Sequence, residues 1–314
     1  MHTKALPYIG LLSLFWGTNI VVSRFGVGEV DPYLFIALRL SVATFFFCLL
    51  FLYQLYRRAQ VWPKDWNLWR HAGVSGVIGV AIPMSLFILS LQYQSSGVAS
   101  IFVTIGPALM VIAAHFFLPD EKMSLNKVLG VALALVGSLL LVLRGENGLA
   151  DSGLVGGQGA SAVGFTFVLI ALCSEVINTI FVRRRMTEMD PFVVTGIRLL
   201  VGAVITSIGA FFLAGNVSWT SFTPASIFSI VYAGVIGALA GQFMAFIIIR
   251  RFGATLFSLT TYLIPIVATT FGVLFLGEIV TLGMLIGMLL VGSGIYLINR
   301  PISPGARMVE DQIR

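Results

Sequence analysis

The stretch DPYLFIALRL at residues 31–40 returns later in the chain as DPFVVTGIRL at residues 190–199. In each copy an Asp-Pro pair precedes an apolar run, and an arginine follows the proline by seven residues. Asp-Pro is typical of a helix start, because the aspartate caps free N–H groups and proline lacks the first of them. The copies are 159 residues apart in a chain of 314, so the stretch predicts an internal repeat.

Further matches surround this pair at nearly the same spacing. Scattered leucine matches arise by chance, but matched Asp-Pro, Arg and Glu at nearly one offset indicate a duplication. The matches are Asn19 and Arg24 with Asn178 and Arg183 at 159; Gly76, Gly79 and Pro107 with Gly234, Gly237 and Pro265 at 158; and Glu121, Gly130 and Gly137 with Glu278, Gly287 and Gly294 at 157.

The composition indicates a lipid environment. Charged residues make up 10% of the chain and hydrophobic residues 58%, whereas a soluble domain carries about 25% charged residues. Apolar stretches of about 20 residues, each long enough to cross a bilayer, recur along the chain. We expect ten transmembrane helices, at residues 5–23, 32–56, 71–93, 97–118, 124–143, 161–182, 191–215, 223–249, 253–276 and 280–299.

The basic residues predict the orientation, because lysine and arginine are enriched in cytoplasmic loops. With the N-terminus inside, 15 of the 19 basic residues fall in cytoplasmic segments, and two, Arg24 and Arg144, in outer loops. We therefore expect a multi-pass protein of the plasma (inner) membrane with both termini cytoplasmic. The net charge of +6 then reflects insertion rather than a nucleic-acid partner.

Five helices per half is an odd number, so the second copy must enter the bilayer upside down. Inverted repeats of this kind are typical of secondary transporters, with a site near the bilayer midplane. The predicted fold is an all-α membrane protein with ten transmembrane helices in two inverted five-helix repeats. The expected units are the first repeat (1–144), a glycine-rich linker (145–160), the second repeat (161–300) and a cytoplasmic tail (301–314).

Four motifs stand out: Phe15-Trp16-Gly17-Thr18-Asn19, Pro32 with Arg39, Pro107 followed by Glu121, and Leu276-Gly277-Glu278. Together they resemble the drug/metabolite transporter superfamily, and within it the EamA-type transporters, over roughly residues 5–299. The second half departs from the pattern, with Ser174-Glu175 where the first has Phe15-Trp16. The resemblance implies export of amino acids or related metabolites through a cavity lined mainly by the first, third, fourth, sixth, eighth and ninth helices.

Glu175 is the most informative candidate for a site. It lies about 13 residues into its helix, or roughly 20 Å deep by helical rise. A carboxylate is costly at that depth, and an ionisable group within a membrane is by default a functional hypothesis. Glu175 could receive a proton, which makes it the proton-coupling candidate, or meet a substrate ammonium. The alternative is a protonated or hydrogen-bonded carboxyl that joins two helices.

Other polar residues are predicted to line the substrate cavity with Glu175. Trp16, Asn19 and Ser23 share one helix face by their spacing, as do Glu175 and Asn178. The alternative for each is a polar contact between helices, worth about 0.6–2 kcal/mol. The predicted cavity set is Trp16, Asn19, Ser23, Ser90, Thr104, Glu175, Asn178, Gln242, Thr261 and Tyr262.

Arg39 and Arg198 are predicted to be structural. Each follows its proline by seven residues, which places it about 10 Å deep, where long side chains reach back to the interface. Asp31 and Asp190 lie two turns earlier and could pair with them. A role in substrate binding is the alternative.

Two further matched pairs concern helix geometry. Pro107 and Pro265 fall near the middle of their helices, where each frees a carbonyl one turn back. We predict hinges there, with a passive kink as the alternative.

Glu121 and Glu278 precede the fifth and tenth helices, where a carboxylate complements the helix N-terminus. Both are therefore predicted to be structural.

A secondary transporter, more specifically an exporter of small polar metabolites, is the favoured function. An uptake or exchange carrier of the same fold, and a non-transporting membrane receptor or structural protein, remain alternatives. No enzyme is expected, because the sequence has no HExxH, no GxSxG and no paired carboxylates within the membrane. No metal or other cofactor is expected from Cys48 and Cys173, which form no CxxC or Cys/His cluster.

Overall fold

The computed structural model describes residues 2–117, 124–149, 160–186, 188–215, 222–252 and 260–299. All regular secondary structure in this part of the chain is helical. Eight helices are long and apolar enough to cross a membrane, and two shorter apolar helices cover Thr260–Leu276 and Leu282–Ile298. The protein is therefore a multi-pass α-helical membrane protein. Glu121, residues 150–159 of the expected linker and the expected tail at 301–314 lie outside the described residues.

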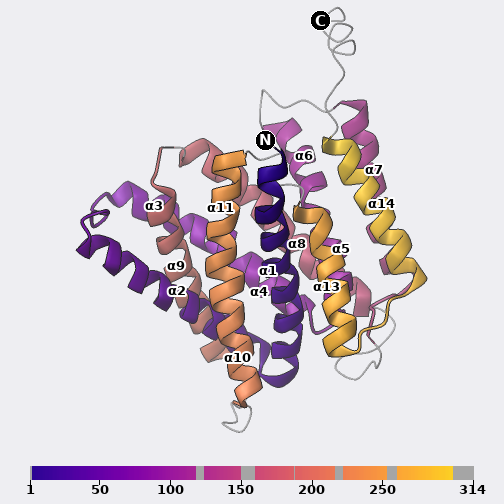
Figure 1. The fold of residues 1–314 in the computed structure, drawn as a ribbon, viewed down its shortest axis with the longest axis horizontal. Helices are drawn as coiled ribbons and strands as arrows, with labels where there is room; N and C mark the ends of the chain where they lie inside the picture. Colours follow the sequence, from indigo (N-terminus) through magenta and orange to yellow (C-terminus); the bar gives the residue numbers. More distant parts are fainter. Residues whose placement is uncertain are drawn as a thin grey trace, which may run out of the picture.

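The helices form one bundle, with α2 and α3 at one margin and α7 and α14 at the other (Figure 1). Two segments, η1 and η3, are π-helices that continue directly into their neighbours. In chain order the elements are α1 (His2–Glu29), α2 (Pro32–Tyr56), α3 (Trp66–Gly76), η1 (Val77–Ala81), α4 (Ile82–Ser90), α5 (Ser96–Val103), α6 (Gly106–Phe117), α7 (Leu125–Leu143), α8 (Ala160–Arg185), α9 (Pro191–Leu213), α10 (Pro224–Tyr232), η3 (Ala233–Ala240), α11 (Gly241–Phe252), α13 (Thr260–Leu276) and α14 (Leu282–Asn299).

The structure refines the predicted helix boundaries. The first helix continues to Glu29, six residues beyond its expected end, and the third begins at Trp66. The fourth is interrupted between α5 and α6, so Pro107 is the second residue of α6 and not a mid-helix residue. The missing N–H of proline is tolerated in a first turn, which explains the new helix start. Pro265 lies inside α13, as expected.

Helices α2 and α9, which carry the two Asp-Pro stretches, pack against each other in opposite directions. Asp31, at the start of α2, accepts a hydrogen bond from the backbone N–H of Gly215, just beyond the end of α9 (3.3 Å). Asp190, at the start of α9, accepts one from Gln60, beyond the end of α2 (2.8 Å). Each aspartate also caps its own helix, so neither is the arginine partner that the sequence suggested.

Helices α7 and α14 also pack in opposite directions, through glycines that the repeat matches. Gly130 faces the backbone of Gly294, while Gly137 faces that of Gly287. An added Cβ at Gly130 or Gly294 would collide with the other residue's carbonyl oxygen. Small residues let membrane helices approach this closely, so these matched glycines are used for packing within the chain.

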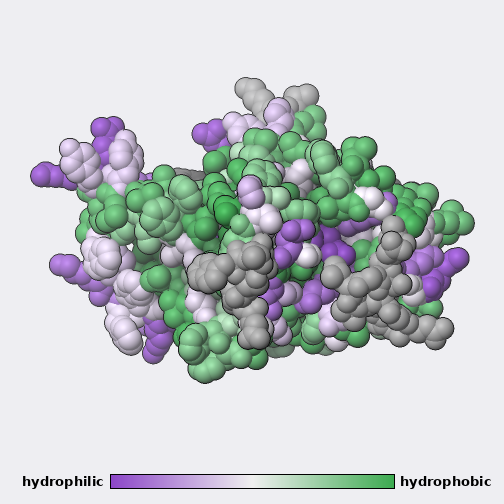
Figure 2. Space-filling model, turned by 90° about the horizontal axis from the view of Figure 1, so that it is seen from below, coloured by the Kyte–Doolittle hydropathy of each residue, from purple (hydrophilic) through white to green (hydrophobic). Residues whose placement is uncertain are grey.

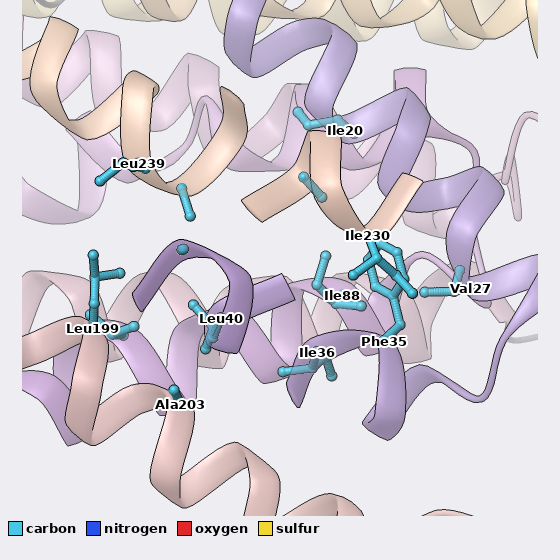
Figure 3. Packing of buried hydrophobic residues seen from close by; sticks show 14 of the residues in the cluster. Ile20, Val27, Phe35, Ile36, Leu40, Ile88, Leu199, Ala203, Ile230 and Leu239 are labelled. Carbon is cyan, nitrogen blue, oxygen red and sulfur yellow. The ribbon is translucent and has the colours of Figure 1, made fainter. Parts of the chain in front are cut away.

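The largest hydrophobic cluster lies where α1, α2, α4, α9, α10 and η3 meet, and Figure 3 shows part of it. Phe35, Ile36 and Leu40 of α2 are at most 1% exposed. In Figure 3, Phe35 lies beside Val27 of α1 and Ile230 of α10. Ile36 and Leu40 belong to the same cluster, with Leu199 of α9. This face of α2 is thus buried against helices of both halves of the chain.

Glu278 caps a different helix from the one that the sequence suggested. Its carboxylate accepts hydrogen bonds from the N–H of Ser96 (2.7 Å), the hydroxyl of Ser96 (2.7 Å) and the N–H of Gly97 (3.3 Å). These groups lie at the N-terminus of α5, not of α14, and Glu278 is 7% exposed. The expected carboxylate–helix interaction is therefore present, but it joins the loop after α13 to a helix of the first half.

The glycine contact between α7 and α14 gives a testable prediction. Replacing Gly294 by alanine should lower thermal stability in detergent by about 1–3 kcal/mol, because its Cβ would press on the Gly130 carbonyl. The matched control is Gly292→Ala in the same helix, where an added Cβ meets nothing within 4 Å. That variant should be neutral or slightly more stable, since alanine favours helix. Equal stability of the two variants would contradict the packing.

Candidate functional site

A cavity of about 390 Å³ lies among the central helices, beside α8. It combines charged, amide and hydroxyl groups with an apolar wall, as substrate sites commonly do. Its lining residues come from α2, η1, α4, α8, α9, η3 and α11: Leu40, Gly79, Val80, Met84, Glu175, Asn178, Thr179, Val182, Arg183, Thr195, Arg198, Leu199, Ala238 and Gln242.

Helix α8 supplies the polar wall of this cavity. Glu175, Asn178, Thr179, Val182 and Arg183 follow one another at helical spacing and so lie on one face. The wall runs from Glu175, in the middle of the span, to Arg183, at the end of the helix. The cavity therefore extends from one end of the bundle toward its middle.

Glu175 and Arg198 place opposite charges in the same cavity. The side chain of Glu175 is exposed although it lies deep in a transmembrane span, because it faces the cavity. Arg198, on α9, lines the same cavity and interacts electrostatically with Glu175. Opposite charges that line one cavity at this depth suit a polar solute better than packed hydrocarbon does.

Arg198 and two other side chains also bind the π-helix η1. Arg198 Nη2 donates to the carbonyl of Gly79 (3.2 Å), and Ser174 Oγ to that of Ile78 (2.6 Å). Ser75 Oγ donates to Asn178 Oδ1 (2.6 Å), and Asn178 packs directly on the backbone at Gly79. π-Helical segments disturb the regular hydrogen-bond pattern and occur frequently at functional sites, and here side chains satisfy the carbonyls.

The matched region of the first half is closely packed. Arg39 is 1% exposed and donates to Ser23 Oγ (3.3 Å) and to the carbonyl of Ala233 in η3 (3.5 Å). Asn19 packs on the backbone at Gly237, as Asn178 does at Gly79. The Thr18 and Tyr232 hydroxyls share a hydrogen bond of 2.7 Å.

The expectation that Arg39 and Arg198 reach back to the interface is wrong. Arg39 donates to the Ser23 hydroxyl and the Ala233 carbonyl, and Arg198 donates to the Gly79 carbonyl, so both guanidinium groups have acceptors within the bundle. Among the described residues, neither arginine forms an ion pair with Asp31 or Asp190. The prediction rested only on the distance of each arginine from the start of its helix. The sequence did not reveal that carbonyls of the π-helices η1 and η3 would accept hydrogen bonds from these arginines.

Of the ten residues predicted to line a cavity, the structure brings Glu175, Asn178 and Gln242 together in this one. The other seven lie outside its lining. Ser90 is fully buried and donates to Phe87 O (2.6 Å), and Thr104 donates to Ile101 O. Tyr262 packs on the cluster that joins α5, α7, α8 and α14. The lining also differs from that implied by the resemblance. Helices α2 and α9, the second and seventh expected spans, contribute to it. The first, fourth and ninth expected spans, which correspond to α1, α5 with α6, and α13, do not.

Sequence reasoning missed Thr179, Thr195 and Arg183 as lining residues. Thr179 and Arg183 could have been found, because they lie four and eight residues after Glu175 and share its face. Thr195 could not, since its position depends on how α9 packs against α2 and η1. Within the described residues, no group of three or more His, Cys, Asp or Glu side chains could hold a metal ion.

Comparison with known proteins agrees with this architecture. The model of the EamA-like transporter family matches residues 3–143 and 162–300. An uncharacterized transporter, YoaV, of Bacillus subtilis is 25% identical over 92% of this chain and 95% of its own. The protein PagO of Salmonella typhimurium is 25% identical over 83% of this chain and 81% of its own. A WAT1-related chloroplastic protein of Arabidopsis thaliana is 24% identical over 91% of this chain and 67% of its own.

Among the solved structures that share the fold is a crystal structure with a TM-score of 0.64 and 19% identity, which covers 96% of this chain and 97% of that one. The family match falls on each half of the chain separately, as the matched Asp-Pro stretches suggested. With two matches that together cover most of its length, this chain belongs to the EamA-like transporter family.

Proposed function

We propose that the chain is a secondary transporter that exports small polar metabolites such as amino acids by alternating access. It would lie in the plasma (inner) membrane with both termini cytoplasmic. Membership of the EamA-like transporter family and the relatives named as transporters support membrane transport. The solute class and the mechanism are inferred from the cavity and from the paired contacts of the two halves.

The proposed architecture is ten transmembrane helices in two inverted five-helix repeats. The antiparallel packing of the matched pairs α2 with α9 and α7 with α14 supports it, because inversion makes matched helices run in opposite directions. The paired contacts of Asn19 on Gly237 and of Asn178 on Gly79 support it further. Each residue pair corresponds to the other under the offset of 158–159 residues.

A difference between the two halves supports alternating access. The second-half residues Thr179 and Glu175 are exposed beside a cavity, whereas the first-half counterpart of Thr179, Ile20, is 5% exposed. Inverted repeats can exchange their conformations, so the closed region around Arg39 would open when the cavity around Arg198 closes. In the proposed orientation the described state is open to the cytoplasm.

The observation that carries the substrate class is that Glu175 and Arg198 line one cavity. A zwitterion can place its ammonium at Glu175 and its carboxylate at Arg198, and the amides of Asn178 and Gln242 can bind further polar atoms. A doubly negative phosphate would meet the Glu175 carboxylate and is disfavoured. Glu175 is also the candidate for proton coupling, because a proton and an ammonium would compete for the same carboxylate.

Glu175→Gln should lower transport of zwitterionic solutes about tenfold or more, since a charge-assisted hydrogen bond contributes about 1.5–3 kcal/mol. Proteoliposomes loaded with an amino-acid mixture, with and without a pH gradient, measure this by mass spectrometry of the released solutes. Dependence on the gradient should disappear in the variant. Glu188→Gln, an exposed carboxylate beyond the end of α8, is the control and should transport normally. Unchanged gradient dependence in Glu175→Gln would remove this residue from coupling.

The reactivity of cysteines placed at two matched positions tests whether only the second half of the chain borders an open cavity. In a Cys48→Ser, Cys173→Ser background, Thr179→Cys should react quickly with a hydrophilic thiol reagent, and Ile20→Cys slowly, because the first lines the cavity and the second is packed. Saturating substrate should protect Thr179→Cys. Equal reaction rates at the two positions, measured by mass spectrometry, would speak against a one-sided cavity.

A further inference from the structure

A second cavity, of about 250 Å³, lies at the opposite face of α9, between α9, α2 and the chain that connects α2 to α3. We call it the α2–α9 groove. Phe47, Val193 and Ile197 form its buried floor, while Cys48, Leu52 and Leu200 form an exposed rim. The lining is apolar, and the rim belongs to the membrane-spanning parts of α2 and α9.

The groove is shaped by specific contacts. Gly196 lies directly against the Phe47 ring, and an added Cβ there would overlap it. The connecting chain is fixed over one end, because Trp69 Nε1 donates to the carbonyl of Pro63 (3.0 Å). Trp62 stands edge-on to Phe51, with ring centroids 5.9 Å apart. Tryptophans at the end of an apolar groove are typical of the boundary between hydrocarbon and headgroups.

Basic residues gather at the tryptophan end of the groove. Arg57 and Arg58 follow the last turn of α2, and Lys64 follows Pro63 of the lining; all three are exposed. The Arg57 guanidinium lies 6.0 Å from the Tyr53 ring centre. Two nearby acids are engaged elsewhere: Asp65 accepts from the N–H of Asn67 (2.9 Å) as the cap of α3, and Asp190 accepts from Gln60 (2.8 Å). In Figure 2 the margin of the bundle that α2 and α3 form lies at the left, and hydrophilic residues are visible there next to a hydrophobic surface.

We propose that the α2–α9 groove binds one acyl chain of an anionic phospholipid, whose phosphate is held by Arg57, Arg58 and Lys64. An apolar cavity that opens to a bilayer is filled by hydrocarbon, since water gains no hydrogen bonds there. The three cations select a negative headgroup at the boundary, as basic segments beside membranes do. This inference does not depend on the solute or on the direction of transport.

The site is placed to influence the polar cavity, because α9 separates the two. Gly196, Ile197 and Leu200 face the groove, whereas Thr195 and Arg198 face the polar cavity. A bound acyl chain would therefore pack on the face of α9 opposite to the polar cavity, at the level where Arg198 binds η1. Anionic lipid should stabilise the described packing of α9.

Native mass spectrometry tests the site on the full chain in detergent, with phosphatidylglycerol and phosphatidylcholine of equal chain length in competition. The wild-type protein should retain one phosphatidylglycerol with about tenfold preference. Arg57→Gln/Arg58→Gln, which removes the cations, and Leu200→Trp, which fills the groove, should each lose that preference. Arg184→Gln/Arg185→Gln, with the same change of charge at the end of α8, should keep it. Equal retention of the two lipids by the wild type would overturn the proposal.

The two native cysteines locate the lipid. Both are exposed, but only Cys48 lines the groove. Phosphatidylglycerol should slow modification of Cys48 by N-ethylmaleimide at least threefold and leave Cys173 unchanged, while glycerol phosphate should protect neither. Equal protection of both cysteines would indicate nonspecific surrounding lipid, and protection by glycerol phosphate would indicate a free-phosphate site; either result contradicts the proposal.

Discussion

In lipid, every backbone carbonyl needs a donor from within the protein, and two arginines, Arg39 and Arg198, meet this need inside the bundle. Arg198 donates to the π-helix η1, and Arg39 donates to the first residue of η3. A π-helix leaves carbonyls displaced from their regular partners, so the arginine and the π-helix require each other. The position of α2 against η3 and that of α9 against η1 both depend on this interaction.

The same interaction explains why charge is found so deep in the membrane. Arg39 is enclosed by Ser23 and the backbone of η3, and its surroundings are packed. Arg198 holds the equivalent position beside a cavity and a carboxylate. One structural element has thus been kept in both halves, and in the second half it also forms part of the candidate site.

The candidate site arises where the second half departs from the repeat. At four matched positions the first half has an apolar or aromatic residue and the second has a polar one that lines the cavity. Duplication supplies the scaffold, and these substitutions supply the chemistry. The pairs are Trp16 with Glu175, Ile20 with Thr179, Ile36 with Thr195, and Met84 with Gln242.

The sequence was sufficient to predict the helical segments, the capping aspartates and three cavity residues, because hydropathy and helical spacing are local properties. Glu175 was identifiable from its depth alone. The place of Thr195 in the lining was not, because it depends on how α9 packs against α2 and η1, across the cavity from α8. Glu278 shows the same limit: its capping chemistry was predictable, but the helix that it caps lies 182 residues away in sequence.

The central claim is that the two halves cross the membrane in opposite directions, and matched residues at the end of α1 and just beyond α8 test it most directly. Glu29 and Glu188 are both exposed and differ by the repeat offset of 159. Each is replaced by cysteine in a Cys48→Ser, Cys173→Ser background and labelled with a membrane-impermeant maleimide in intact cells and in inverted vesicles. We expect Glu29→Cys to react from outside and Glu188→Cys from the cytoplasmic face. Reaction of both from one face would contradict the inverted architecture and the transport mechanism built on it.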